Sequence, residues 1–200
     1  MSHLDLDTAT GRLTRKQRYN LLDGIDSQAG SSQPAVRSDG TVLQTGDRWL
    51  DTSDRSWWWW NGTYWLSEQI YTAAAAASSV TMSTAFGILP VSPSVNLFLL
   101  NFEFVGRYNS MNDATNYWSI SLLRMSSSNI SAATEASFDS KTFTAATQVF
   151  SSITLNSHRD VGGLGIVGFR LEVLRVGLAG ALAHLSARLT YRLAKAPIVY

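Results

Sequence analysis

The stretch Ile166-Val-Gly-Phe-Arg-Leu-Glu-Val-Leu-Arg-Val176 decides the fold class. From Val167 to Val173 every second position carries a large apolar side chain, Val167, Phe169, Leu171 and Val173, and the positions between them carry Gly168, Arg170 and Glu172. Successive side chains of a strand point to opposite faces, so a period of two predicts a strand with one buried face.

Three further segments show the same alternation, at residues 95–105, 117–125 and 182–193. The expected core-facing residues are Phe98, Leu100, Phe102 and Phe104 in the first, Trp118, Ile120 and Leu122 in the second, and Leu185, Ala187, Leu189, Tyr191 and Leu193 in the third. Weaker strand patterns occupy residues 80–89, 134–143 and 147–155. About six to eight strands in one domain predict an all-β fold, an antiparallel β-sandwich of jelly-roll or Greek-key type over residues 80–200.

A different pattern precedes the sandwich, in Gly-Asp-Arg-Trp-Leu-Asp-Thr-Ser-Asp-Arg-Ser-Trp-Trp-Trp-Trp-Asn-Gly-Thr-Tyr-Trp at residues 46–65, which holds six of the seven tryptophans. Asn61-Gly62 between two aromatic runs predicts a type I′ hairpin, because both turn positions of that type need positive φ. A second tight turn is expected at residues 51–55. Residues 46–71 therefore predict a small three-stranded meander rich in tryptophan.

The aromatic side chains of this meander are the first candidate site. Four consecutive tryptophans place two rings on each face of a strand, and so small a meander cannot bury both faces. We expect an assembly interface formed by Trp57, Trp58, Trp59, Trp60, Tyr64 and Trp65. Two alternatives stay open: a small core within the chain, and a platform on which sugar rings stack.

The remaining segments are polar or of low complexity. Residues 1–45 predict a docking arm, with one short helix at 14–23 that cannot bury itself and so lies along a partner; a disordered tail is the alternative. Residues 72–79, Thr-Ala-Ala-Ala-Ala-Ala-Ser-Ser, predict a linker or a turn of helix.

Composition excludes several classes of function. The chain has no cysteine and a net charge of +1, so thiolate sites and a basic nucleic-acid surface are not expected. No segment is apolar enough to span a bilayer, and the N-terminus lacks signal-peptide features, so we expect synthesis in a host cytoplasm and no membrane insertion. The three histidines lack metal-ligand spacing, and no nucleophile motif occurs. We therefore expect neither an enzyme nor a bound metal or cofactor.

The pattern Gly46-Asp-Arg-Trp-Leu-Asp-Thr52 followed by Trp60-Asn-Gly-Thr-Tyr-Trp65 resembles a short module of tailed-bacteriophage fibre and appendage proteins, G-D-x-W-x-D-T … W-N-G-T-x-W. The strand sequences at 117–120 and 189–193 also resemble tips of such fibres. The resemblance implies a virion protein, a short tail fibre that forms a homotrimer. Its arm, residues 1–45, would dock on the baseplate, tail or capsid. Its sandwich would contact host envelope, in particular a surface polysaccharide.

Two other functions remain open. A capsid decoration or cement protein would use the same arm, trimer and sandwich, and a small depolymerase would need a catalytic carboxylate. If the chain binds a receptor, loops at an end of the sandwich are expected to carry the site, at residues 108–117 and 156–165. The candidate residues there are Tyr108, Asn112, Asp113, Asn116, His158, Arg159 and Asp160.

Overall fold

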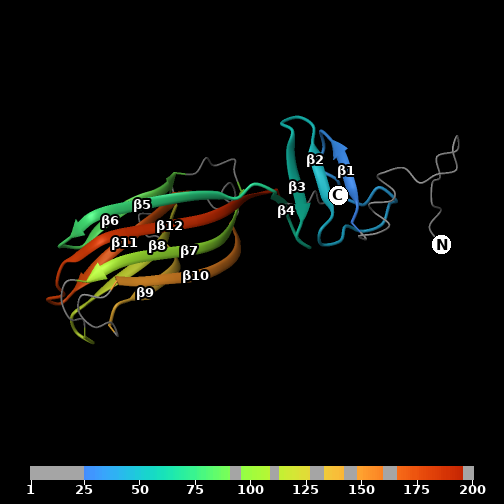
Figure 1. Ribbon diagram of the computed structural model, residues 1–200. Helices are drawn as coiled ribbons and strands as arrows, with labels where there is room; N and C mark the ends of the chain where they lie inside the picture. The colour runs from blue at the N-terminus through green and yellow to red at the C-terminus, as the bar shows by residue number, and fades with distance from the viewer. Residues whose placement is uncertain are drawn as a thin grey trace, which may run out of the picture. The chain divides into compact units, whose positions relative to one another are not determined.

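The computed structural model describes residues 25–90, 96–108, 113–126, 133–141, 148–159 and 166–195. All regular elements in these ranges are strands, so none of them is a helix long and apolar enough to cross a membrane. The chain divides into two units (Figure 1). The first, here the tryptophan unit, comprises Met1–Gln69 and Ala194–Tyr200, and the second, the sandwich unit, comprises Ile70–Leu193.

The sandwich unit consists of two four-stranded layers (Figure 1). One layer has the order β5-β12-β7-β10 and the other β6-β11-β8-β9. The strands are β5 (Tyr71–Val80), β6 (Thr84–Pro90), β7 (Asn96–Tyr108), β8 (Tyr117–Ser126), β9 (Ala133–Asp139), β10 (Gln148–Arg159), β11 (Ile166–Val176) and β12 (Leu182–Lys195). Counted from one to eight along the chain, the layers read 1-8-3-6 and 2-7-4-5, which is the jelly-roll arrangement. The predicted all-β sandwich of jelly-roll type is therefore confirmed.

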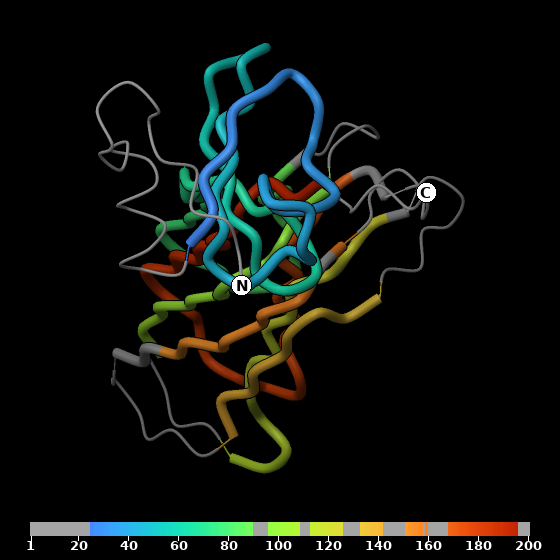
Figure 2. Tube along the Cα trace, turned by 90° about the vertical axis from the view of Figure 1, so that its right-hand side faces the viewer, coloured from blue at the N-terminus to red at the C-terminus, as the bar shows by residue number. Residues whose placement is uncertain are grey.

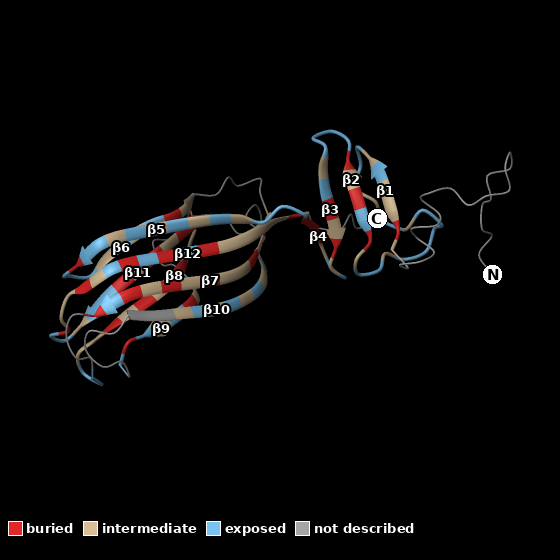
Figure 3. Ribbon diagram, in the orientation of Figure 1, coloured by how far each residue is buried: buried red, intermediate tan, exposed pale blue. Residues whose placement is uncertain are grey.

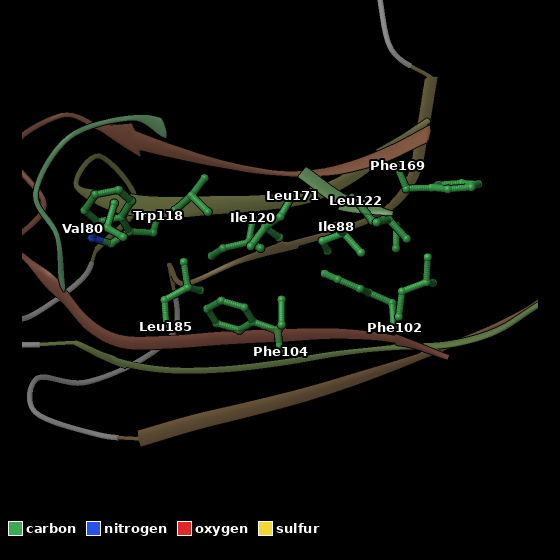
Figure 4. Packing of buried hydrophobic residues seen from close by; sticks show 14 of the residues in the cluster. Val80, Ile88, Phe102, Phe104, Trp118, Ile120, Leu122, Phe169, Leu171 and Leu185 are labelled. Atoms are coloured by element: carbon green, nitrogen blue, oxygen red, sulfur yellow. The ribbon is translucent and has the colours of Figure 1, made fainter. Parts of the chain in front are cut away.

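The core lies between the two layers and is apolar throughout (Figure 4). Trp118, Ile120 and Leu122 of β8 lie in a row along it, as the alternation predicts. The expected core faces of β11 and β12 are also confirmed by the buried residues Phe169, Leu171, Val173, Leu185, Ala187 and Leu189. Tyr191 and Leu193 are half-buried, and the side chain of Val167 lies outside the described residues.

The predicted core face of β7 is wrong over its first half. Leu97 and Leu99 are buried there, whereas Phe98 and Leu100 are half-buried. Phe102 and Phe104 are core residues as expected, so the buried positions of β7 skip from 99 to 102. At the same point the pairing with β10 shifts register, between Thr154 and Ser157. A bulge reverses the faces of a strand, and periodicity alone does not reveal it.

Residues 72–79 form no connector but most of β5, which corrects the predicted linker. They pair with β12 from Thr72↔Thr190 to Ser79↔Ala183. Ala73, Ala75 and Ala77 pack against the core from this strand. Alanine has the highest intrinsic helix propensity, but propensity is a weak preference that tertiary pairing overrides, as it does along the ten residues of β5.

The tryptophan unit contains the predicted meander, formed by β2 (Arg48–Asp51), β3 (Ser56–Trp60) and β4 (Trp65–Ser67). Two additions lie outside the predicted boundaries. Strand β1 (Ser27–Gly30) pairs in parallel with β2, and the end of β12 pairs with β4 at Ala194↔Leu66 and Lys195↔Trp65. Residues from the predicted arm and from the far end of the sequence thus complete this small sheet. The predicted helix at 14–23 lies outside the described residues.

The turn between β3 and β4 differs from the predicted type I′ hairpin. Gly62 has a φ of +99°, but Asn61 does not have positive φ. The side-chain oxygen Oδ1 of Asn61 instead accepts hydrogen bonds from the backbone N–H groups of Thr63 (2.9 Å) and Tyr64 (2.7 Å). The loop therefore has four residues and is held by an Asx turn, the other common use of asparagine in turns.

Candidate assembly surface and loop sites

The tryptophan unit has a core of four indole rings. They belong to strands β2, β3 and β4, which carry buried positions in red in Figure 3. Trp49, Trp58, Trp60 and Trp65 are all buried. The ring centroids of Trp49 lie 6.3 Å from Trp58 and 6.0 Å from Trp65, and Trp60 lies 5.5 Å from Trp65. Offset or tilted aromatic pairs at these distances attract one another. The assignment of Trp58, Trp60 and Trp65 to an assembly interface is therefore corrected: these rings stabilise the chain's own fold.

A charged pair closes this aromatic core. The Lys195 ammonium lies 4.6 Å from the ring centroid of Trp49 and 4.2 Å from that of Trp58. It also donates a hydrogen bond to Oδ2 of Asp51 over 2.7 Å. Burial raises the pKa of Asp51, but the hydrogen bonds from Lys195 and Ser53 outweigh it and lower the pKa to about 2. The buried carboxylate thus stays ionised, and its counter-ion stacks on the indoles.

Asp47, the other acid of the G-D-x-W-x-D pattern, holds the loops of the unit together. Arg37 donates to both of its carboxylate oxygens, over 2.9 and 2.7 Å, and the backbone N–H groups of Asp26 and Gln44 donate over 2.9 and 2.8 Å. Burial raises the pKa of Asp47, yet these bonds lower it below its usual value. Gly46 precedes it with a φ of +99°. The residues of the G-D-x-W-x-D pattern are therefore explained by folding.

The opposite face of the meander carries Trp57 and Trp59. Trp57 is 40% exposed and pairs in register with Leu50, whereas Trp59 is half-buried and pairs with Arg48. Arg48 forms an exposed ion pair with Glu68 over 3.6 Å. Tyr64, the remaining predicted interface residue, is half-buried in the β3–β4 loop. An exposed indole beside a strand-paired leucine and an ion pair is a surface suited to contact with protein.

The predicted loop residues Asp113 and Asn116 lie in one tight turn. The carboxylate of Asp113 accepts hydrogen bonds from the Asn116 side chain and from Thr115, and these bonds lower its pKa well below its usual value. Oδ1 of Asn116 accepts a hydrogen bond from the backbone N–H of Leu178 over 2.7 Å. This turn is therefore tied to the β11–β12 turn, where Leu178 is 86% exposed. Both turns present a fixed surface at one end of the sandwich.

Other predicted loop residues are placed differently. Tyr108 is only 1% exposed, so its assignment to a receptor-facing loop is wrong; it is a core residue at the end of β7, and burial raises its pKa to about 12. His158 and Arg159 belong to strand β10 and not to a loop, although the side chain of His158 lies outside the described residues. Asn112 and Asp160 also lie outside them.

Arg159 belongs to a charged cluster that the sequence did not indicate. Its Nε donates to both oxygens of Glu135, over 2.8 and 3.0 Å, and its terminal nitrogen bonds the same carboxylate. Nη1 of Arg124, on β8, lies 3.4 Å from Oε1 of Glu135. Strands β9 and β10, which carry Glu135 and Arg159, run side by side at one edge of the sandwich, in gold and orange in Figure 2. The cluster thus joins the two layers.

No group of three or more His, Cys, Asp or Glu residues that could hold a metal ion occurs in the described part of the chain.

No family model and no curated protein matches the chain. Among solved structures, it is similar to an Eiger TNF from S. frugiperda, with 13% identity over 66% of this chain and 97% of that one and a TM-score of 0.39. It is also similar to a chain of the cyanophage Pam1 capsid (14% identity, 80% and 99% covered, TM-score 0.39). A third is the tobacco streak virus coat protein (10% identity, 66% and 90% covered, TM-score 0.33). At such scores these likenesses say nothing about what this chain does.

Proposed function

We propose that this chain is a structural protein of a virion, a short tail fibre that assembles as a homotrimer and contacts the host envelope through its sandwich unit. The proposal rests on the resemblance of residues 46–65 to a module of phage fibre proteins. This module folds as a compact meander with its own aromatic core, and an eight-stranded jelly roll follows it directly. A small module with its own core, joined to a larger sandwich, suits a protein that docks on the particle through one part and binds the host through the other.

The outer face of the meander supports the assembly part of the proposal. Trp57 and Leu50 are paired there, and the exposed ion pair of Arg48 with Glu68 lies on the neighbouring positions. Assembly interfaces commonly place aromatic rings at the centre and charged residues at the rim. The three copies of a trimer would bring three such faces together, and three weak receptor contacts would add through avidity.

The second candidate is a capsid decoration protein that stabilises the head shell. The jelly-roll topology favours it, because this architecture recurs in viral capsid domains as well as in sugar-binding domains. Under this alternative the N-terminal arm would bind capsid subunits, and loss of the protein would weaken the shell but leave adsorption intact.

Immunogold labelling of intact particles, viewed by electron microscopy, separates the two candidates. A fibre predicts gold at the tail end, and the isolated protein should then compete with particles for host cells. Gold spread over the head would overturn the fibre proposal in favour of the decoration protein. Absence of label from purified particles that retain every other structural protein would overturn both.

A further inference from the structure

The charged cluster of Arg124, Glu135 and Arg159 occupies positions that face the core. Arg124 continues the inward row of Trp118, Ile120 and Leu122 along β8, and it pairs in register with the buried Phe169 of β11. Arg159 pairs in register with the buried Leu97. Directly paired residues of antiparallel strands point to the same face. The apolar interior therefore ends in three charged side chains at this point of the sandwich edge.

A local irregularity turns the carboxylate inward. Strand β9 shifts register against β8 between Leu122↔Ala136 and Leu123↔Thr134, so Glu135 is the extra residue of a bulge. Its side chain is only 3% exposed. Bulges re-aim side chains and recur next to functional sites. Placing a carboxylate in such a position is unfavourable unless cations compensate it.

The positive charge beside Glu135 is larger than its single negative charge requires. Counted over the described residues alone, the two guanidinium groups and one carboxylate of the cluster carry a net charge of +1, with Arg124 27% and Arg159 26% exposed at the side chain. Arg159 already forms a two-pronged pair with Glu135, whereas Arg124 adds one longer contact of 3.4 Å. The two guanidiniums share one carboxylate and repel each other, and an added anion would reduce that repulsion.

From this geometry we infer an oxyanion site at the sandwich edge, in which Arg124 and Arg159 bind one carboxylate or phosphate group while Glu135 holds both guanidiniums in place. Arginine suits this task because its planar donors match the oxygens of either group. The inference deepens the proposed function and rests on it for the source of the anion: it names the receptor class as an acidic envelope polysaccharide, carrying either uronic-acid carboxylates or phosphate groups.

The test uses the full chain, labelled with ¹⁵N, and follows the arginine Nε–Hε resonances during titration with sodium glucuronate, inorganic phosphate or neutral glucose at constant ionic strength. We expect saturable shifts of Arg124 and Arg159 with at least one of the two anions and none with glucose. Whichever anion binds more tightly identifies the source. The matched reference is Arg170, which is 28% exposed and pairs with Glu172 over 3.2 Å; its resonance should stay unchanged.

Two variants separate the charge of Arg124 from its packing. Arg124→Gln should weaken binding tenfold or more, with the thermal midpoint nearly unchanged because the Arg159–Glu135 pair remains, and Arg124→Lys should bind within about threefold of the wild type. If Arg124→Gln fails to fold, the wild-type titration and the lysine variant still decide. Shifts that do not saturate, equal shifts at Arg170, or unchanged binding by Arg124→Gln would overturn the site. The outcome of the titration does not depend on where gold labels the particle. The oxyanion site and the tail-fibre function can therefore fail separately.

Discussion

The Nζ of Lys195 lies 2.7 Å from Oδ2 of Asp51, across 144 positions of sequence. Asp51 belongs to the second strand of the tryptophan unit, and Lys195 is the last residue of β12, which runs the length of the sandwich unit before it pairs with β4. The first unit of the chain is therefore completed only by residues that follow the second. Lys195 also lies against two of the buried indoles, so one side chain serves both the ion pair and the aromatic core.

Replacing Lys195 by methionine tests how much the Lys195–Asp51 ion pair stabilises the tryptophan unit. The variant keeps much of the apolar stem but leaves the Asp51 carboxylate, 6% exposed at the side chain, without its cation. Removing one partner of a buried pair is costly, so we expect a loss of about 2–3 kcal/mol in the free energy of unfolding. Urea unfolding followed by tryptophan fluorescence measures it.

Lys141 provides the matched control. It also combines an ion pair, 3.4 Å to Asp139, with a position 4.5 Å from the ring centroid of Tyr117, but both charged side chains are more than 40% exposed. Exposed pairs contribute about 0–1 kcal/mol, so Lys141→Met should be nearly neutral. Equal losses in the free energy of unfolding for Lys195→Met and Lys141→Met would show that the burial of Asp51 does not determine the loss.

The same pair predicts how stability depends on pH. The pKa of Asp51 is lowered from 3.8 to about 2 in the folded chain, so its ionised form stabilises the fold above about pH 4, and this contribution is lost as the pH falls through about 2. A shift of this size corresponds to about 2 kcal/mol. The stability difference between the wild type and Asp51→Asn should therefore be largest at pH 5–7 and shrink towards pH 2. Thermal unfolding at a series of pH values checks it, and a difference independent of pH would refute the lowered pKa.

The close approach of Gly177 to Thr115 gives a prediction about the turns at one end of the sandwich. The φ of Gly177 is +61°, and a Cβ at this position would lie 2.4 Å from the backbone oxygen of Thr115. Gly177→Ala should therefore separate the 113–116 turn from the β11–β12 turn and cost at least about 1–2 kcal/mol. Gly87→Ala, on strand β6 with open space around the new methyl group, should be neutral or slightly stabilising. Calorimetry of both variants compares them directly, and equal midpoints would contradict the tight approach.

The strands of the sandwich could be predicted from sequence because most of them keep one regular face. In β8 and β11 the alternation of apolar and polar residues matches burial almost throughout. The sequence of β7 also alternates between apolar and polar residues, but a bulge near Leu100 and Asn101 exchanges the buried and the outer face. No residue type at that point indicates a bulge. The alanine run of β5 could not be assigned either, because its strand form depends on pairing with β12 more than 100 positions away.

The site residues were harder to predict for a related reason. Sequence showed that the tryptophans form one cluster, but which face is buried depends on β1, Arg37 and Lys195, which lie outside the module. Likewise Glu135 and Arg159 are both visible in the sequence as ordinary polar residues. Their contact arises because β9 and β10 form the edges of two different layers, which depends on the topology of the whole jelly roll.

The two faces of β3 give the last prediction, which tests assembly. Trp58 is 4% exposed and stacks on Trp49, so Trp58→Ala should cost about 3–5 kcal/mol and unfold the tryptophan unit. Trp57 is 40% exposed on the other face, so Trp57→Ala should change the free energy of unfolding by less than about 1 kcal/mol. If that outer face is the proposed trimer contact, Trp57→Ala alone should shift the protein to monomer while it stays folded. Sedimentation velocity combined with urea unfolding distinguishes the outcomes, and a folded Trp57→Ala that associates like the wild type would remove this face from the assembly proposal.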